Sequence, residues 1–193
     1  MVHVRAMTVA DLASVLAVQS ACYQPRFQEP LASFAFKLAR HPDSAWVAVA
    51  RATSEEGRRE ARDDGETVAG YCFAQGAQWG CPPPLGDQGN AAPQPGSESS
   101  SGINWVLHVH DVAVAPWAQG KGVAGRLMRT AMAWGRVTKG WTVAQIVAVQ
   151  GSVERWGRMG YVVGVPNKDL EGDYGEGAAF MWQPLVGGER ARL

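Results

Sequence analysis

The segment that most constrains the fold is a strand and a glycine-rich loop that lead directly into a helix. The strand signal covers 103–116 (INWVLHVHDVAVAP), where β-branched and apolar residues end at Pro116. The pattern G-x-G-x-x-G follows at 120–125, and apolar residues at helical spacing continue to about Arg136. Glycines let a backbone approach an anion closely, and the first helical turn offers unpaired N–H groups and a positive dipole end. The segment therefore predicts a phosphate-binding turn in an α/β fold.

The glycine pattern alone fits a dinucleotide-binding turn, but the residues after it do not. Such a turn needs a carboxylate about 20 residues further on to hold the ribose, within a doubly wound parallel sheet. The next predicted strand, 142–149, ends at Gln150, and no acidic residue lies between Gly125 and Glu154. Only 68 residues, 126–193, remain after the glycines. We therefore interpret the loop as a site for another diphosphate.

The rest of the chain predicts a mixed sheet with the element order βααβββαβαββ. The predicted strands cover 2–6, 45–50, 67–77, 103–116, 142–149, 161–165 and 177–185. The first predicted helix has Thr8 as its N-cap and Asp11 at the N3 position, a capping-box pattern. Three further helices are predicted from near Pro30 to before Pro42, from the glycine loop to about Arg136, and over 152–160.

Composition narrows the class of protein. The 193 residues suit a single domain over 1–193, with polar insertions at about 53–66 and 80–102. Eighteen basic and eighteen acidic residues cancel, so nothing indicates a nucleic-acid or membrane partner. The three cysteines lack the spacing of a disulfide framework or a zinc site, so no metal is expected. No apolar run of about 18 residues could cross a membrane, and we expect a cytoplasmic protein.

At residues 119–124 the sequence QGKGVA has the form [RQ]-x-x-G-x-[GA], and here the chain resembles the GNAT N-acetyltransferase superfamily. In that superfamily the loop binds the pyrophosphate of acetyl-coenzyme A (acetyl-CoA). The resemblance extends through LHVHDVAVAPWAQGKGVAGRLM and IVAVQGSVERWGRMGYVV. It implies a single-domain α/β fold whose mixed, twisted sheet is flanked by helices. The sheet is expected to splay between the family's fourth and fifth strands, here 103–116 and 142–149.

Four further segments resemble the arylalkylamine (serotonin) and polyamine N-acetyltransferase-like subgroup: FAFKLARHPDSAWVAVA, AGYCFAQGAQWGCPPPL, HVHDVAV and DYGEGAAFM. This resemblance, over roughly 3–185, implies transfer of acetyl from acetyl-CoA to a primary amine by direct attack. Two alternatives stay open. One is a protein or peptide N-acetyltransferase. The other is a non-catalytic module that binds acyl-CoA, suggested by the absence of a tyrosine at position 156.

The resemblance also assigns the coenzyme-binding residues. Backbone groups on the strand are expected to pair with the pantetheine arm, and one of their N–H groups to polarise the thioester carbonyl. Lys121 is expected to supplement phosphate binding, and Trp156 to pack beside the arm. The full set is Val112, Ala113, Val114, Gln119, Gly120, Lys121, Gly122, Val123, Ala124, Gly125 and Trp156.

His108 and His110 are the candidates for removing a proton from the amine. They are two residues apart, so a regular strand projects both from one face, and histidine titrates near neutrality. In the serotonin acetyltransferase branch a His-x-His pair at this place removes the proton. The alternative is a hydrogen-bonded core histidine. Asp111 is expected on the opposite face in a structural role, unless a bulge redirects it.

The leaving thiolate needs a proton, and here the chain departs from the superfamily. Many members use a tyrosine where this chain has Trp156, and an indole N–H is not a useful acid. Tyr174 is the candidate donor, with packing as its alternative. The other routes are protonation by water or by one of the histidines, and departure of the thiolate without a proton. On the acceptor side, four aromatic residues are candidates to house an aryl ring and Glu29 to attract a cation. The four are Tyr23, Phe27, Phe34 and Trp79.

Overall fold

The computed structural model describes residues 2–51, 65–87 and 104–185, and most of the two predicted polar insertions lies outside these ranges. The described residues form two compact units. The N-terminal unit contains 2–51, 65–75, 85–87 and 109–131, and the C-terminal unit contains 76–84, 104–108 and 132–185. The chain passes between the units inside the continuous elements β3 (Glu66–Gln78), β4 (Trp105–Val114) and α4 (Val123–Lys139).

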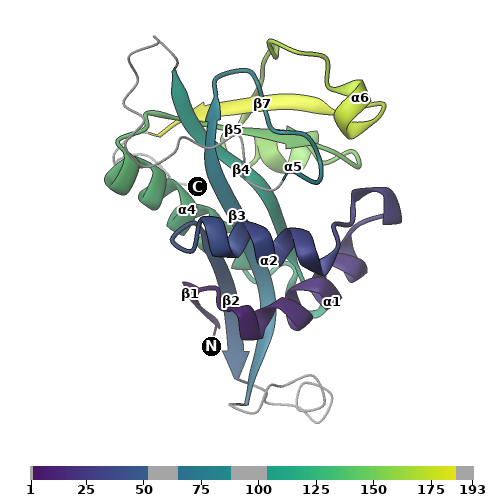
Figure 1. Cartoon of the computed structure of the whole chain (residues 1–193), viewed down its shortest axis with the longest axis vertical. Coiled ribbons are helices and arrows are strands. Elements are labelled where there is room, and N and C mark those ends of the chain that lie inside the picture. The colour runs from purple at the N-terminus through teal and green to yellow at the C-terminus, as the bar shows by residue number, and fades with distance from the viewer. Residues whose placement is uncertain (1, 52–64, 88–103, 186–193) are drawn as a thin grey trace. The chain divides into compact units, whose positions relative to one another are not determined.

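The strands pair into a mixed sheet in the order β1-β2-β3-β4-β5-β7-β6 (Figure 1). The remaining strands are β1 (Val2–Ala6), β2 (Ala45–Arg51), β5 (Val143–Ala148), β6 (Val162–Val163) and β7 (Ala179–Pro184). β2 runs antiparallel to β1 and β3, and β7 runs antiparallel to β5 and β6. The fold class predicted from the sequence, a mixed α/β sheet with helices, is confirmed.

Strands β4 and β5 are the parallel pair that the sequence predicts. Their register joins Leu107 to Ala144 and His108 to Gln145. These four residues all belong to the C-terminal unit, whereas the second half of β4 belongs to the N-terminal unit. The splay between these strands therefore stays a prediction.

In the N-terminal unit, α1 (Leu12–Cys22) and α2 (Leu31–Arg40) follow their predicted boundaries and lie across β2 and β3 (Figure 1). The turn before α1 is fixed as the capping pattern predicts, because the Thr8 N–H and hydroxyl both donate to Asp11 Oδ2, at 2.7 and 2.9 Å. Short 3-10 turns occupy Val9–Asp11, Pro25–Phe27 and Pro116–Ala118. Pro30 precedes α2, where its missing N–H costs no helical hydrogen bond.

The core beneath α2 is aromatic. Phe34 is fully buried, and its ring packs edge-on against Tyr71 and tilted against Phe73, at centroid distances of 5.9 and 5.1 Å. Phe34, one of the aromatic residues expected to line an acceptor pocket, therefore packs in the core of this unit.

The C-terminal unit holds α5 (Val153–Gly157) and α6 (Glu171–Tyr174) beside β5 and β7. Fully buried Gln145 on β5 accepts from the Gly80 N–H at 3.0 Å and donates to the Gln78 carbonyl at 3.3 Å. Trp79 packs edge-on against both Phe180 and Trp182 on β7, each at 5.5 Å. The start of the second polar insertion is thus part of this unit's core.

Two predicted elements differ clearly in extent, and one short helix was not predicted. The helix after the glycine loop continues to Lys139, and the strand expected over 161–165 is reduced to Val162 and Val163. The helix α6 was not predicted, because four residues, EGDY, are too few to show helical periodicity.

Candidate active site

The glycine loop has the backbone geometry of an anion cradle. Gly120 and Gly122 have φ angles of 75° and 73°, the left-handed region that side chains disfavour. A Cβ at either position would meet nothing within 4 Å, so the space beside both is open. The helix α4 begins directly after them, and its first helical bond runs from the Arg126 N–H to the Gly122 carbonyl. The N–H groups of Val123, Ala124 and Gly125 therefore form the first turn, which leaves donors for a ligand.

The third glycine of the pattern has no comparable requirement. Gly125 lies inside α4 without a positive φ, and a Cβ there would lie 3.4 Å from the flexible end of Arg129. The loop therefore needs the first two glycines, of which the acetyltransferase-like pattern specifies Gly122, and it does not need the third glycine of the dinucleotide pattern.

The predicted polar side chains of the loop bond to nearby backbone. Gln119 Nε2 donates to the Val114 carbonyl at 3.1 Å. Lys121 Nζ donates to the Trp117 carbonyl at 2.7 Å and lies 5.7 Å from the centre of the Trp117 ring. Both residues are exposed. Gln119 thus fixes the end of β4 relative to the loop, and the Lys121 ammonium is held next to it.

The two sides of β4 in the N-terminal unit have different partners. A Cβ on Gly70 of β3 would lie only 2.6 Å from the Ala113 carbonyl oxygen, and the Ala115 N–H donates to Ala69 of β3. Backbone groups of alternate residues point to opposite sides of a strand. Ala113 therefore faces β3, and the backbone groups of Val112 and Val114 face away from it.

The carbonyl groups on this outer side of β4 accept from side chains. Tyr23 Oη donates to the Val112 carbonyl at 2.9 Å. The Val114 carbonyl accepts from Cys22 Sγ at 3.2 Å as well as from Gln119. Since Tyr23 and Cys22 follow each other at the end of α1, this helix end is fixed against the outer side of β4. Of the three predicted backbone positions, Val112 and Val114 present their groups on this side.

The side chain of His110 lies against a buried carboxylate that the sequence did not connect to it. His110 Nε2 is 3.4 Å from Glu29 Oε1, and the two side chains are 3% and 6% exposed. The same oxygen accepts from the Gly86 N–H at 2.7 Å, and Glu29 Oε2 accepts from Lys37 Nζ at 2.5 Å. Gln19 fixes the Glu29 backbone through two hydrogen bonds of 2.9 Å. The carboxylate thus joins α2, β4 and the segment around Gly86.

The electrostatics of this cluster keep Glu29 ionised. Burial raises the pKa of Glu29, but the hydrogen bond and charge of His110 and the charge of Lys37 outweigh burial and lower the pKa to about 2. A buried carboxylate beside an imidazole orients the ring and fixes its tautomer. One sequence signal could have indicated that Glu29 is buried. Glu29 comes just before a helix, and that helix carries a lysine, Lys37, on its buried face.

His108 lies in a different setting from His110. It is 1% exposed, and it pairs in register with Gln145 within the C-terminal unit. His110 belongs to the N-terminal unit. The carboxylate contact described above is made by His110.

Asp111 is bonded to the α2 side of the sheet. Tyr71 Oη, whose ring packs on Phe34, donates to Asp111 Oδ2 at 2.7 Å, and Tyr23 lies near the same carboxyl group. Burial raises the pKa of Asp111, and the nearby tyrosine hydroxyls oppose that rise. Because neighbouring His110 is also joined to residues from this side, the contacts favour a strand irregularity over the regular alternation that was expected.

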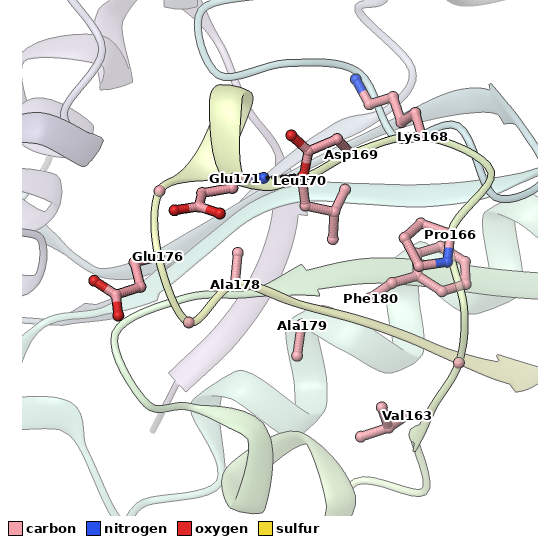
Figure 2. A pocket seen from close by; sticks show the side chains of 13 residues that line it. Val163, Pro166, Lys168, Asp169, Leu170, Glu171, Glu176, Ala178, Ala179 and Phe180 are labelled. Carbon is pink, nitrogen blue, oxygen red and sulfur yellow. Dashed lines mark hydrogen bonds between the residues drawn. The ribbon is translucent and has the colours of Figure 1, made fainter.

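Phe27, a predicted acceptor-pocket residue, is buried in the N-terminal unit, whereas Trp156 and Tyr174 lie in the C-terminal unit. Trp156 packs edge-on against Tyr161 at 5.5 Å. Tyr174 is 5% exposed, and its hydroxyl donates to the Pro83 carbonyl. A hollow of about 440 Å³ also lies here, between β6, α6 and β7. Figure 2 shows Glu171 and Glu176 on one side of it and Pro166 and Phe180 on the other. It contains none of the predicted site residues.

The described residues contain neither a cluster of metal ligands nor a membrane-spanning helix. Within them, no group of three or more His, Cys, Asp or Glu side chains is placed to hold a metal ion. No helix in the part of the chain that the structure describes is long and apolar enough to cross a membrane.

A parallel strand pair, a left-handed glycine loop and a helix that begins at that loop are the features of an α/β fold in which the loop can receive an anion. Residues 13–161 match the model of the acetyltransferase (GNAT) family, and the chain therefore belongs to that family. No curated protein matches the chain by sequence.

Solved structures share the fold at low sequence identity. The loading GNATL domain of CurA from Lyngbya majuscula is similar with a TM-score of 0.68 and 11% identity, over 96% of this chain and 98% of that one. The GphF GNAT-like decarboxylase in complex with isobutyryl-CoA has a TM-score of 0.65 and 15% identity, over 95% and 100%. Naa20 from Chaetomium thermophilum in complex with a bisubstrate analogue has a TM-score of 0.62 and 18% identity, over 94% and 86%.

Proposed function

We propose that this chain is an N-acetyltransferase that moves acetyl from acetyl-CoA to a primary amine of the arylalkylamine or polyamine class. The observation that carries the proposal is the contact between His110 Nε2 and Glu29 Oε1. The GNAT family assignment supplies acyl transfer, and similar structures were solved with isobutyryl-CoA, as in GphF, or with CoA, as in the NatB complex. The histidine supplies the proton acceptor that an ammonium substrate requires.

The residues around the glycine loop fit the coenzyme. Its pyrophosphate needs backbone donors and open space, and the turn at Gly120 and Gly122 offers both. The pantetheine arm contains amide groups that can bond to the outer side of β4. There the carbonyls of Val112 and Val114 already accept from side chains. The N–H groups of the same two residues are therefore the groups we assign to the arm and to the thioester carbonyl.

His110 acts as the general base in this proposal. With Nε2–H directed at Glu29, the lone pair is on Nδ1, which takes a proton from the ammonium group. The freed amine attacks the thioester carbon, the C–N bond forms, and the C–S bond breaks with its electron pair on sulfur. Glu29 holds the tautomer and stabilises the imidazolium, so it is a positioning residue. His108 and Tyr174 remain predicted contributors, and Tyr174 would have to release the Pro83 carbonyl to act.

The test is thiol release from acetyl-CoA in the presence of an amine panel and a matched panel of peptides. Release with arylalkylamines or polyamines supports the proposal. Release with peptides alone would identify a protein N-acetyltransferase instead. If the chain binds CoA but none of the amines or peptides causes thiol release, it is a binding module.

A further inference from the structure

The proposed reaction leaves a thiolate that needs a proton, and the two residues considered first are poorly suited to supply it. The indole N–H of Trp156 has no useful acidity, and its ring packs on Tyr161. The hydroxyl of Tyr174 donates to the Pro83 carbonyl, and Pro83 is not among the positions to which we assign the coenzyme arm. Another O–H group near the outer side of β4 would fill the role better.

Tyr23 places such a hydroxyl on β4. It is the C-cap residue of α1, with an extended backbone, and its Oη donates to the Val112 carbonyl at 2.9 Å. Gln28 Nε2 donates to the Tyr23 carbonyl at 2.7 Å, so the residue is held at its backbone as well as at its hydroxyl. Val112 is one of the two positions to which we assign the pantetheine arm.

The titratable neighbours of Tyr23 keep its proton in place until it is needed. Burial and the nearby Asp111 and Cys22 raise the pKa of Tyr23 well above its ordinary value, against the effect of the Val112 bond. The phenol is therefore protonated at neutral pH. Asp111 accepts from Tyr71 and also lies near Tyr23, so carboxyl and hydroxyl groups are grouped beside the Tyr23 side chain.

We propose that Tyr23 is the catalytic acid that protonates the coenzyme sulfur, an inference that rests on the proposed acetyl transfer. As the C–S bond breaks, the sulfur keeps the electron pair and takes the Tyr23 proton, and the tyrosinate regains a proton from solvent. The ammonium nitrogen loses two protons during the whole reaction. In the net balance one of them is found on the CoA thiol and the other is released to solvent. Tyr71 and Asp111 position the hydroxyl.

The first test needs no acceptor amine. The thiolate absorbance of CoA bound to the protein is titrated in the wild type and in Tyr23→Phe. A hydroxyl that donates to sulfur stabilises the thiolate, so the variant should raise the pKa of the bound thiol by about one unit. Tyr174→Phe, the competing donor, should leave it unchanged. The proposal would be overturned if the pKa of the bound thiol is the same in Tyr23→Phe as in the wild type, or if it rises in Tyr174→Phe alone.

The second test uses the leaving group. With acetyl-CoA, Tyr23→Phe should lower the single-turnover rate by about 10²-fold. With the acetyl selenoester of seleno-CoA the loss should largely disappear, because a selenolate leaves without a proton. An equal loss with both donors would show a structural role. If Tyr23→Phe does not fold, 3-fluorotyrosine at position 23 should move the alkaline limb of the rate profile to lower pH, and a stationary limb would refute the role.

The two proposals can fail separately. If the wild type acetylates no amine but the thiol pKa still responds to Tyr23→Phe, the proposed function fails while the contact of Tyr23 with sulfur stands. If amines are acetylated and neither test responds to position 23, the function stands and the acid lies elsewhere.

Discussion

Glu29 and His110 are 81 positions apart in the sequence, and their side chains meet at 3.4 Å between Oε1 and Nε2. The carboxylate also binds a buried ammonium and a backbone N–H, so its position is fixed from three directions. A base held in this way enters the reaction with its tautomer and orientation already set.

The Glu29–Lys37 pair should be costly to break on one side. Glu29→Gln leaves the Lys37 ammonium buried without a carboxylate, and we expect a loss of about 3–5 kcal/mol in the free energy of unfolding. Urea unfolding measures it. The double variant Glu29→Gln with Lys37→Met removes both charges and should recover a large part of the loss. If the single and double variants have the same free energy of unfolding, the loss in Glu29→Gln does not come from the unpaired Lys37 charge.

Glu29 also predicts how stability depends on pH. Its pKa in the folded protein, about 2, lies below the ordinary value of 4.5, so the folded state binds this proton more weakly than the unfolded state. The stabilisation is therefore complete above pH 4.5 and is lost as the pH falls toward 2. Unfolding measured across this window should show a steeper loss in the wild type than in Glu29→Gln. If stability falls with pH in parallel in the two proteins, Glu29 is not the source of the pH dependence.

Substitution of Gly120 or Gly122, which have positive φ angles, should weaken CoA binding, whereas substitution of Gly125 should not. Gly120→Ala and Gly122→Ala each strain the backbone by about 1–2 kcal/mol and shift the loop N–H groups. We expect weaker binding of CoA in calorimetry, by tenfold or more. Gly125→Ala is the matched control, because its φ is helical and the nearest atom is a movable arginine end. If all three variants bind CoA alike, the loop does not cradle the pyrophosphate.

Sequence patterns predicted what depends on local structure. The strand at β4, the loop glycines and α4 are specified by neighbouring residues, and each was placed within a few positions. The partners of the site side chains were not predictable in this way, since Glu29 reaches His110 and Tyr23 reaches Val112 only after α1 and α2 pack on the sheet. Tyr23 was assigned to an aryl pocket because an aromatic residue before a loop gives no sign of its hydroxyl partner.

His108 offers a comparison within the same strand. The contact with Glu29 is made by His110, so we expect His108→Gln to lower the rate less than the same change at His110. Steady-state rates of both single variants and the double variant measure this. If the two histidines share the proton through water, their effects will not be additive. A larger loss at His108 would move the base to that residue.

The most direct test of the account is the pH dependence of kcat/KM for acetyl transfer in the wild type and in His110→Gln, with CoA binding measured alongside. If His110 removes the ammonium proton, the variant should lose roughly 10²-fold or more in kcat/KM. Its acidic limb should move or flatten, while the CoA affinity set by the glycine loop stays the same. A variant that keeps the full rate and an unchanged acidic limb would leave His110 as a packed strand histidine and contradict the account.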